Sequence, residues 1–158
     1  RDVGATISAI GLRGAELTAE DFREVELQGE TLDHGGNRSV TVHVTNILPF
    51  LVLKSFALDE RVKDKDAYDI VWTLAAYSGG GGAAAVAAKE SPVREYHDVI
   101  DGIDRLRDHF AEIDAAGASF YARFFGHGDP TDETGIRLRR FARGSVQQFL
   151  EEWDRGVD

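Results

Sequence analysis

The stretch LPFLVLKSFALDERVKDKDAYDIVWTL, residues 48–74, places a group of charged residues between two apolar segments. Proline is tolerated in the first turn of a helix, where its missing N–H would have no partner, so Pro49 predicts a helix over residues 49–61. The return of apolar residues predicts a second helix over residues 66–78. An ordinary surface loop does not require apolar segments on both sides. We therefore take this charged turn as the candidate functional region.

Lys54 is the unusual residue of the first predicted helix, because its neighbours at helical spacing are all apolar: Phe50, Leu51, Ala57 and Leu58. A buried ammonium requires an anion, either a carboxylate or the phosphate of a ligand. Asp66 and Asp69 lie one turn apart on the second predicted helix and are the candidate carboxylates. Two interpretations stay open. Lys54 and Asp66 form a structural ion pair beside solvated basic residues, or the turn is a polyphosphate site.

The residues from Lys54 to Ile70 form a specific pattern, Lys54-x-x-Ala57-Leu58-x-x-Arg61-x-Lys63-x-Lys65-Asp66-Ala67-Tyr68-Asp69-Ile70. This string resembles the signature of AbiEii/AbiGii-type nucleotidyltransferases, many of which are toxins of toxin–antitoxin pairs. The family pattern K-x-x-A-L-x-x-R-x-K-x-K-D-x-x-D is met at every fixed position. The motif itself covers about residues 50–75, and the predicted strands before it and helices after it are compatible with the family.

The resemblance implies transfer of a nucleoside monophosphate from an NTP to an acceptor, often RNA, with Mg²⁺. It implies that Lys54 contacts the nucleotide phosphates and that Asp66 is functionally important in catalysis. The remaining motif residues are expected in the nucleotide- and phosphate-binding set: Arg61, Lys63, Lys65 and Asp69. A cognate antitoxin protein is an expected partner. The alternative is a non-catalytic module on the same scaffold that binds a nucleotide or a partner protein.

One part of the family pattern is absent from the sequence. The family's catalytic centre also has Gly-Gly or Gly-Ser followed by Asp-x-Asp on a strand, and that carboxylate pair holds the metals. Gly35-Gly36 is followed by a predicted strand without carboxylates, and no Asp-x-Asp occurs before residue 48. We therefore expect either that a segment with the metal carboxylates precedes this sequence or that the protein has lost catalysis. No metal ligand is assigned.

The predicted fold is α+β and nucleotidyltransferase-like, in a single domain of residues 1–158. Alternating apolar residues predict strands at 1–12, 23–28 and 39–45, with the last two paired antiparallel across a turn-rich connection. We expect a small antiparallel or mixed sheet within residues 1–47 and a helical bundle packed behind it in residues 48–158. Besides the two helices described above, apolar periodicity predicts helices at 83–89, 91–115, 117–125 and 133–153.

Other candidate sites are weaker. Glu24 and Glu26 share one face of a predicted strand. They are either a metal-binding pair or ordinary acids on the solvent face of the strand. His43 is left unassigned, and the glycines at 79–82 lack the Lys-Ser/Thr of a phosphate loop. The last predicted helix carries a second basic cluster, for an RNA backbone, an acidic partner or local salt bridges: Arg137, Arg139, Arg140 and Arg143.

Composition narrows the function classes. The 158 residues carry a net charge of −10, which argues against a general nucleic-acid coat and restricts any RNA contact to a local surface. The absence of cysteine excludes disulfides and thiolate metal sites and is compatible with a cytoplasmic protein. No apolar run approaches the ~18 residues of a membrane span, so no membrane partner is expected.

Overall fold

The computed structural model describes residues 11–30 and 35–156, so nearly all of the strand predicted at residues 1–12 lies outside the described residues. Within them the chain is α+β, with a two-stranded antiparallel sheet in the N-terminal third and mostly helices after it. The elements are α1 (Leu17–Glu20), β1 (Phe22–Glu30), β2 (Asn37–Thr45), α2 (Ile47–Arg61), α3 (Asp64–Ala76), α4 (Gly80–Lys89), α5 (His97–His109), α6 (Ala116–Phe124) and α7 (Glu133–Asp154).

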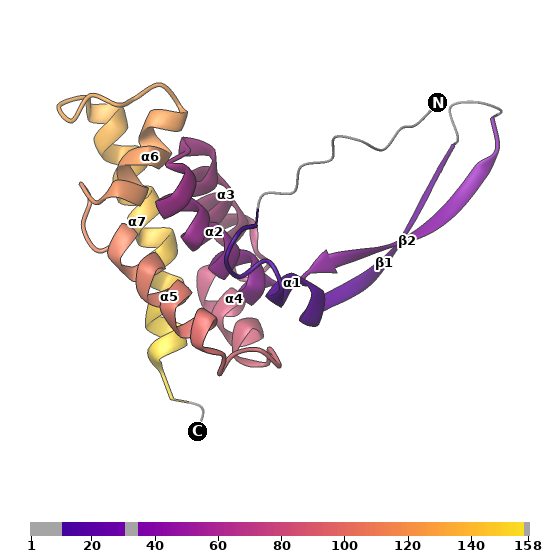
Figure 1. Cartoon of the computed structure of the whole chain (residues 1–158). Coiled ribbons are helices and arrows are strands. Elements are labelled where there is room, and N and C mark those ends of the chain that lie inside the picture. Colours follow the sequence, from indigo (N-terminus) through magenta and orange to yellow (C-terminus); the bar gives the residue numbers. More distant parts are fainter. Residues whose placement is uncertain (1–10, 31–34, 157–158) are drawn as a thin grey trace.

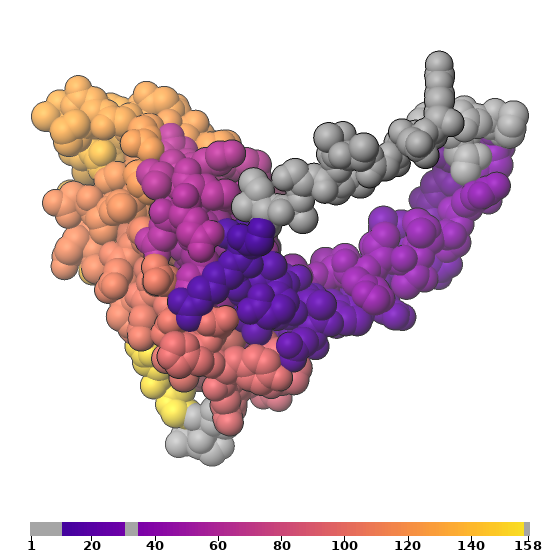
Figure 2. All heavy atoms as spheres, in the orientation of Figure 1, coloured from indigo at the N-terminus to yellow at the C-terminus, as the bar shows by residue number. Residues whose placement is uncertain are grey.

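The two strands form a hairpin that projects from the helices as an arm (Figures 1 and 2). β1 pairs with β2 from Phe22 opposite Thr45 to Glu30 opposite Asn37, which confirms the predicted antiparallel pairing. Leu27 and Val40 face each other in the ladder and are 50% and 56% exposed. The expectation that the helices pack behind the sheet is therefore wrong. A two-stranded sheet offers little apolar surface, so the helices pack against one another and not against the sheet.

The helices bury their apolar faces mainly against one another. α2 has fully buried residues on several sides, among them Leu48, Leu51, Val52 and Phe56, because α3, α4 and α5 all contact it. In the described part of the chain six helices follow the hairpin, one for each of the six predicted helical segments. The helix that carries Lys54 is thus a core helix, with Lys54 at its seam with α3 and Asp59 paired with Arg105 and His109 of α5.

The helix predicted over residues 91–115 is shorter than expected. α5 comprises only His97–His109, since Tyr96 before it has extended backbone angles and Phe110 ends it. Val93 and Phe110 are still buried, but from the flanking turns, whereas Ile100 and Ile113 are exposed. Apolar spacing alone did not distinguish a continuous helix from a helix with packed turns at both ends.

The glycine segment begins α4, which starts at Gly80 directly after Gly79 in the left-handed region. Gly81 faces α7 so closely that a Cβ there would lie 2.8 Å from the Ser145 carbonyl oxygen. Asp132 caps the start of α7 by accepting hydrogen bonds from the Thr134 and Gly135 N–H groups. The Gly81 contact thus sets the approach of α4 to α7, and the Asp132 cap sets where α7 begins.

None of the described helices is by itself long and apolar enough to cross a membrane. α3 and α4 satisfy the length and composition only as a pair bent by 95°.

Candidate functional site

The seam between α2 and α3 brings Lys54 together with both predicted carboxylates. The Lys54 Nζ atom lies 2.8 Å from Asp66 Oδ1 and 2.7 Å from Asp69 Oδ2. The turn at Val62 and Lys63 reverses the chain, with Val62 in the left-handed region, and sets the start of α3 beside the end of α2. The close approach inferred from the Lys54 environment is therefore present.

Two further motif residues join this cluster. Arg61 Nη2 donates to Asp66 Oδ1 at 2.6 Å, and Lys65 Nζ donates to both oxygens of Asp69 at 2.7 and 2.8 Å. We call these five residues the ion network. Its exposure is graded, since the side chain of Asp66 is 2% exposed, that of Lys54 17% and that of Lys65 69%. The cations thus extend from the core to the surface.

The charges of the network support one another. Burial lowers the pKa of Lys54, but hydrogen bonds to Asp66 and Asp69 outweigh this effect and raise the pKa above its usual value. For Asp69, burial raises the pKa, yet hydrogen bonds from Lys54 and Lys65 outweigh it and the net pKa is lowered. Lys54 and Asp69 therefore both remain charged over the physiological pH range.

Asp66 holds the buried end of the network. Its Oδ1 atom accepts from both Lys54 and Arg61, while its Oδ2 atom is buried and has no hydrogen-bond partner among the described residues. Its position in the first turn of α3 also favours a negative charge through the helix dipole. This geometry suits a residue that positions two cations better than one that accepts a proton from substrate.

Lys63 is the motif residue that the structure leaves outside the network. It occupies the N-cap position of α3, its side chain is exposed, and no ion-pair partner occurs for it within the described ranges. Its backbone carbonyl accepts the Asp66 N–H at 2.9 Å. Lys63 is therefore a surface charge at the edge of the site.

A groove continues from the ion network toward the base of the hairpin. Phe50 and Thr73 lie one helical turn from Lys54 and Asp69, and the Lys54 Nζ atom is 6.0 Å from the centre of the Phe50 ring. The groove has a volume of about 290 Å³ and is lined by Arg23, Val44, Thr45, Asn46, Ile47, Phe50, Thr73 and Tyr77. An apolar floor with Arg23 in its lining and Lys54 close to Phe50 suits a molecule that has both an apolar ring and anionic groups.

The groove is not among the sites predicted from the sequence. The four-residue steps from Lys54 back to Phe50, and from Asp69 on to Thr73 and Tyr77, are a signal that could have placed these three residues on the same helix faces. No sequence signal places Arg23 there, because its position depends on how the hairpin leaves the helices. The groove is a tertiary feature.

The magnesium that the resemblance implies does not fit the ion network. Three cations already surround its two carboxylates, and the one oxygen without a partner, Asp66 Oδ2, is buried, whereas Mg²⁺ takes an octahedral set of oxygen ligands and keeps several waters. In the described ranges one group, His97, Asp98 and Asp101, has ligand atoms close enough to share an ion. Both aspartates of that group are paired with Arg13, and a nitrogen ligand is not typical of magnesium. No step of the chemistry is assigned to a metal here.

Glu24 and Glu26 do not form a shared site. Glu24 pairs with His43 at 3.4 Å, and Glu26 accepts a hydrogen bond from Ser39. All four side chains are exposed on the arm. The interpretation as solvent-facing acids therefore describes the pair better than the interpretation as metal ligands.

The second basic cluster is divided among different surroundings. Arg139 is buried and donates to the carbonyl oxygens of Asp129 and Pro130, and Arg143 donates to that of Ala111 at 2.8 Å. Arg137 is exposed, with Glu133 at 4.0 Å, and Arg140 is also exposed. These four residues do not act as one anion-binding patch, because two of them satisfy backbone carbonyls instead.

Comparisons with protein-family models, with curated proteins and with solved structures give no match. The function is therefore argued from the geometry of the ion network and the groove.

Proposed function

We propose that the chain is the nucleotide-binding part of a nucleotidyltransferase-like protein and that it binds the phosphates of an NTP at the ion network. The observation that supports this most directly is the composition of the network, in which Lys54, Arg61 and Lys65 outnumber Asp66 and Asp69 by three charges to two. The net positive charge occurs on a chain whose total charge is −10. A local positive site on an acidic protein favours a specific anion over a general polyanion.

The donors for phosphate remain available within the network. An ammonium has three N–H donors, of which Lys54 uses two, and a guanidinium has five, of which Arg61 uses one on Asp66. In the proposal the phosphates contact Lys54, Arg61 and Lys65, while the base lies along the groove beside Phe50. Asp66 and Asp69 are positioning residues that hold the cations in place before the ligand binds.

The proposed reaction transfers a nucleoside monophosphate. An acceptor hydroxyl oxygen forms a bond to the α-phosphorus, the bond from that phosphorus to the oxygen bridging to the β-phosphorus breaks, and pyrophosphate leaves while the hydroxyl proton passes to solvent water. Cations on the phosphates lower the cost of the charge that develops on the leaving group. RNA is the proposed acceptor, and a toxin-like role with an antitoxin partner is part of the same proposal.

A non-catalytic module is the second candidate. The observation that favours it is that the two carboxylates of the network are already neutralised and do not offer a metal site. Such a protein would bind a nucleotide, or a partner protein, at the same residues without turnover.

The binding step is tested by titrating each of the four NTPs into the wild-type protein by calorimetry. Lys65→Gln and Arg61→Gln remove exposed cations of the network, so we expect affinity to fall by roughly tenfold each, the scale of one charge-assisted hydrogen bond. Arg38→Gln removes an exposed charge from the arm and is the matched control. Equal affinities for the control and the two network variants would contradict the site.

Catalysis is tested separately with an NTP labelled at the α-phosphate and a mixed RNA acceptor, in the presence of Mg²⁺. Transfer of label that is lost in Lys54→Ala supports the enzyme. NTP binding without transfer supports the non-catalytic module. Expression of the wild type and of Lys54→Ala in growing cells then tests the toxin-like role through growth arrest.

A further inference from the structure

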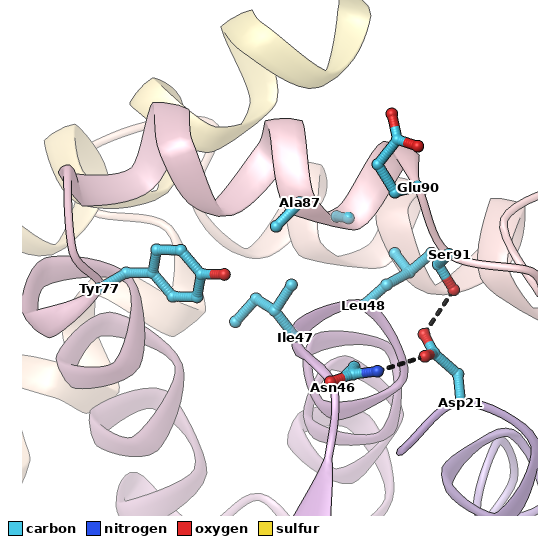
Figure 3. A pocket seen from close by; sticks show the side chains of 9 residues that line it. Asp21, Asn46, Ile47, Leu48, Tyr77, Ala87, Glu90 and Ser91 are labelled. Atoms are coloured by element: carbon cyan, nitrogen blue, oxygen red, sulfur yellow. Dashed lines mark hydrogen bonds between the residues drawn. The ribbon is translucent and has the colours of Figure 1, made fainter. Parts of the chain in front are cut away.

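A second cavity lies at the base of the arm, next to the groove, and nothing in the proposed nucleotide site uses it. It has a volume of about 210 Å³ and shares Asn46, Ile47 and Tyr77 with the groove. Four segments meet there: the junction of α1 and β1, the start of α2, Tyr77 at the C-terminal end of α3, and the C-terminal end of α4 with the turn after it (Figure 3). The cavity is therefore formed by tertiary packing rather than by one loop.

Asp21 is the buried charge of this cavity, with only 5% of its surface exposed. Its Oδ1 atom accepts from Asn46 Nδ2 at 2.6 Å, and its Oδ2 atom accepts from Ser91 Oγ at 2.5 Å (Figure 3). Both donors are neutral. The lining contains a second acid, Glu90 at the rim, and no lysine, arginine or histidine among the described residues. A buried carboxylate without a countercharge is costly, and a cation in the cavity would offset that cost.

We propose that this cavity binds a small organic cation that carries N–H donors, such as an alkylammonium or guanidinium group. A carboxylate has about four acceptor positions, so Asp21 retains acceptors beyond the two bonds it makes within the protein. The Tyr77 hydroxyl also points toward the cavity and has no hydrogen-bond partner in the described part of the chain (Figure 3). Ile47, Leu48 and Ala87 provide apolar contacts for a short alkyl chain. The volume equals that of about seven water molecules, which limits the ligand to a few carbon atoms.

The contacts of Asp21 with Asn46 and Ser91 also have a structural role, because they join the base of the arm to the helices. That role requires hydrogen-bond acceptors but no negative charge. Cation binding requires the charge. The two roles are separated by Ala87→Leu, which reduces the volume of the cavity and leaves Asp21 with its Asn46 and Ser91 contacts in place.

The test is a titration of wild-type protein with butylammonium chloride at constant ionic strength, followed by amide chemical shifts in NMR. The neutral isostere 1-butanol and the donor-free cation tetramethylammonium are titrated in parallel. Ala87→Leu fills the cavity from an exposed position of α4, so the fold is retained. Glu112→Gln removes an exposed acid elsewhere and controls for the general attraction of cations to an acidic protein.

We expect saturable shifts at Asp21, Asn46 and Ser91 with butylammonium, an affinity at least roughly tenfold lower for both comparison compounds, and loss of saturation in Ala87→Leu. Asp21→Asn, where it folds, is expected to behave like Ala87→Leu, and Glu112→Gln like wild type. The proposal is overturned if wild type shows no saturation, if Ala87→Leu binds as wild type does, or if 1-butanol binds equally well.

Discussion

Lys54 shows how a cation is retained in a helical core. Its stem lies among apolar neighbours on α2, while its ammonium is held by two carboxylates of α3. Removing one partner of such a group leaves the other charges buried and uncompensated, which is more costly than the pair itself is stabilising. Substitution of a single residue of the ion network should therefore be destabilising.

Lys54→Met keeps the apolar stem and removes the charge. We expect the free energy of unfolding to fall by about 3 kcal/mol, because Asp66 then retains Arg61 alone in a buried setting. Urea unfolding measures the change. Lys63→Met removes a neighbouring charge without an observed ion-pair partner and should stay within about 0.5 kcal/mol of wild type. A Lys54→Met variant as stable as Lys63→Met would contradict the buried network.

The pH dependence of stability depends on the same residues. The pKa of Asp69 is lowered in the folded state, so its contribution is complete above its ordinary pKa of 3.8 and is lost as the pH falls through the lower folded value. Lys54, with a raised pKa, contributes below its ordinary pKa of 10.5 and loses that contribution as the pH rises further.

We therefore expect Asp69→Asn to lose less stability than wild type when the pH is lowered through 3.8, although it is less stable at neutral pH. Urea unfolding midpoints on both sides of that pH measure the difference. Glu112→Gln, at an exposed position, should follow the wild-type curve. Parallel curves for wild type and Asp69→Asn would show that Asp69 is not stabilised by the network.

At the scale of elements, the pair formed by α4 and α7 depends on close backbone approach. Gly81 would place a Cβ 2.8 Å from the Ser145 carbonyl oxygen and 3.1 Å from the Phe149 nitrogen, both backbone atoms that cannot rotate away. Gly82, its neighbour in the same helix, would meet nothing within 4 Å. The two positions make a matched pair of substitutions.

Gly81→Ala is expected to destabilise the protein by about 1–3 kcal/mol through overpacking at α7. Gly82→Ala is expected to stabilise it by about 0.5 kcal/mol, since alanine favours the helix and meets no obstacle. Thermal or urea unfolding of the two variants checks both signs. If both variants are stabilised, α4 does not pack against α7 as closely as observed.

The motif region is also an element-scale property. Apolar and charged spacing predicted two helices at 49–61 and 66–78, and the structure has α2 at Ile47–Arg61 and α3 at Asp64–Ala76. Spacing was sufficient because most of the apolar residues of both helices are buried and the turn between them is short. The helix predicted at 91–115 was too long, because residues in its flanking turns are also buried and mimic helical periodicity.

At the scale of the whole molecule, the arm and the helices differ in how they are stabilised. The outer part of the hairpin, near Glu30 and Asn37, is exposed on both strands, whereas α3 has fully buried residues such as Ile70 and Leu74. An isolated two-stranded hairpin is at best marginally stable in water. Local opening of the arm should therefore need less free energy than unfolding of the helices.

We expect the backbone amides of the outer hairpin to exchange with deuterium at least roughly tenfold faster than those of α3 at neutral pH. Hydrogen exchange followed by mass spectrometry measures both segments in one experiment. Leu27→Lys, an exposed substitution on the arm, should leave the unfolding of the helices within about 0.5 kcal/mol. Equal protection of the arm and α3 would mean that another surface covers the hairpin in solution.

By itself the sequence determined the α+β class, the antiparallel hairpin, the two helices of the motif and the need of Lys54 for an anion. Each of these depends on residues close together in the chain or on the cost of burying one charge. The tertiary structure alone decided that the hairpin projects from the helices, that Arg23 lines the groove, and that Asp21 meets Asn46 and Ser91. It also divided the arginines of α7 between buried and exposed surroundings. These features depend on contacts between residues far apart in the chain, and local periodicity carries no information about which distant faces meet.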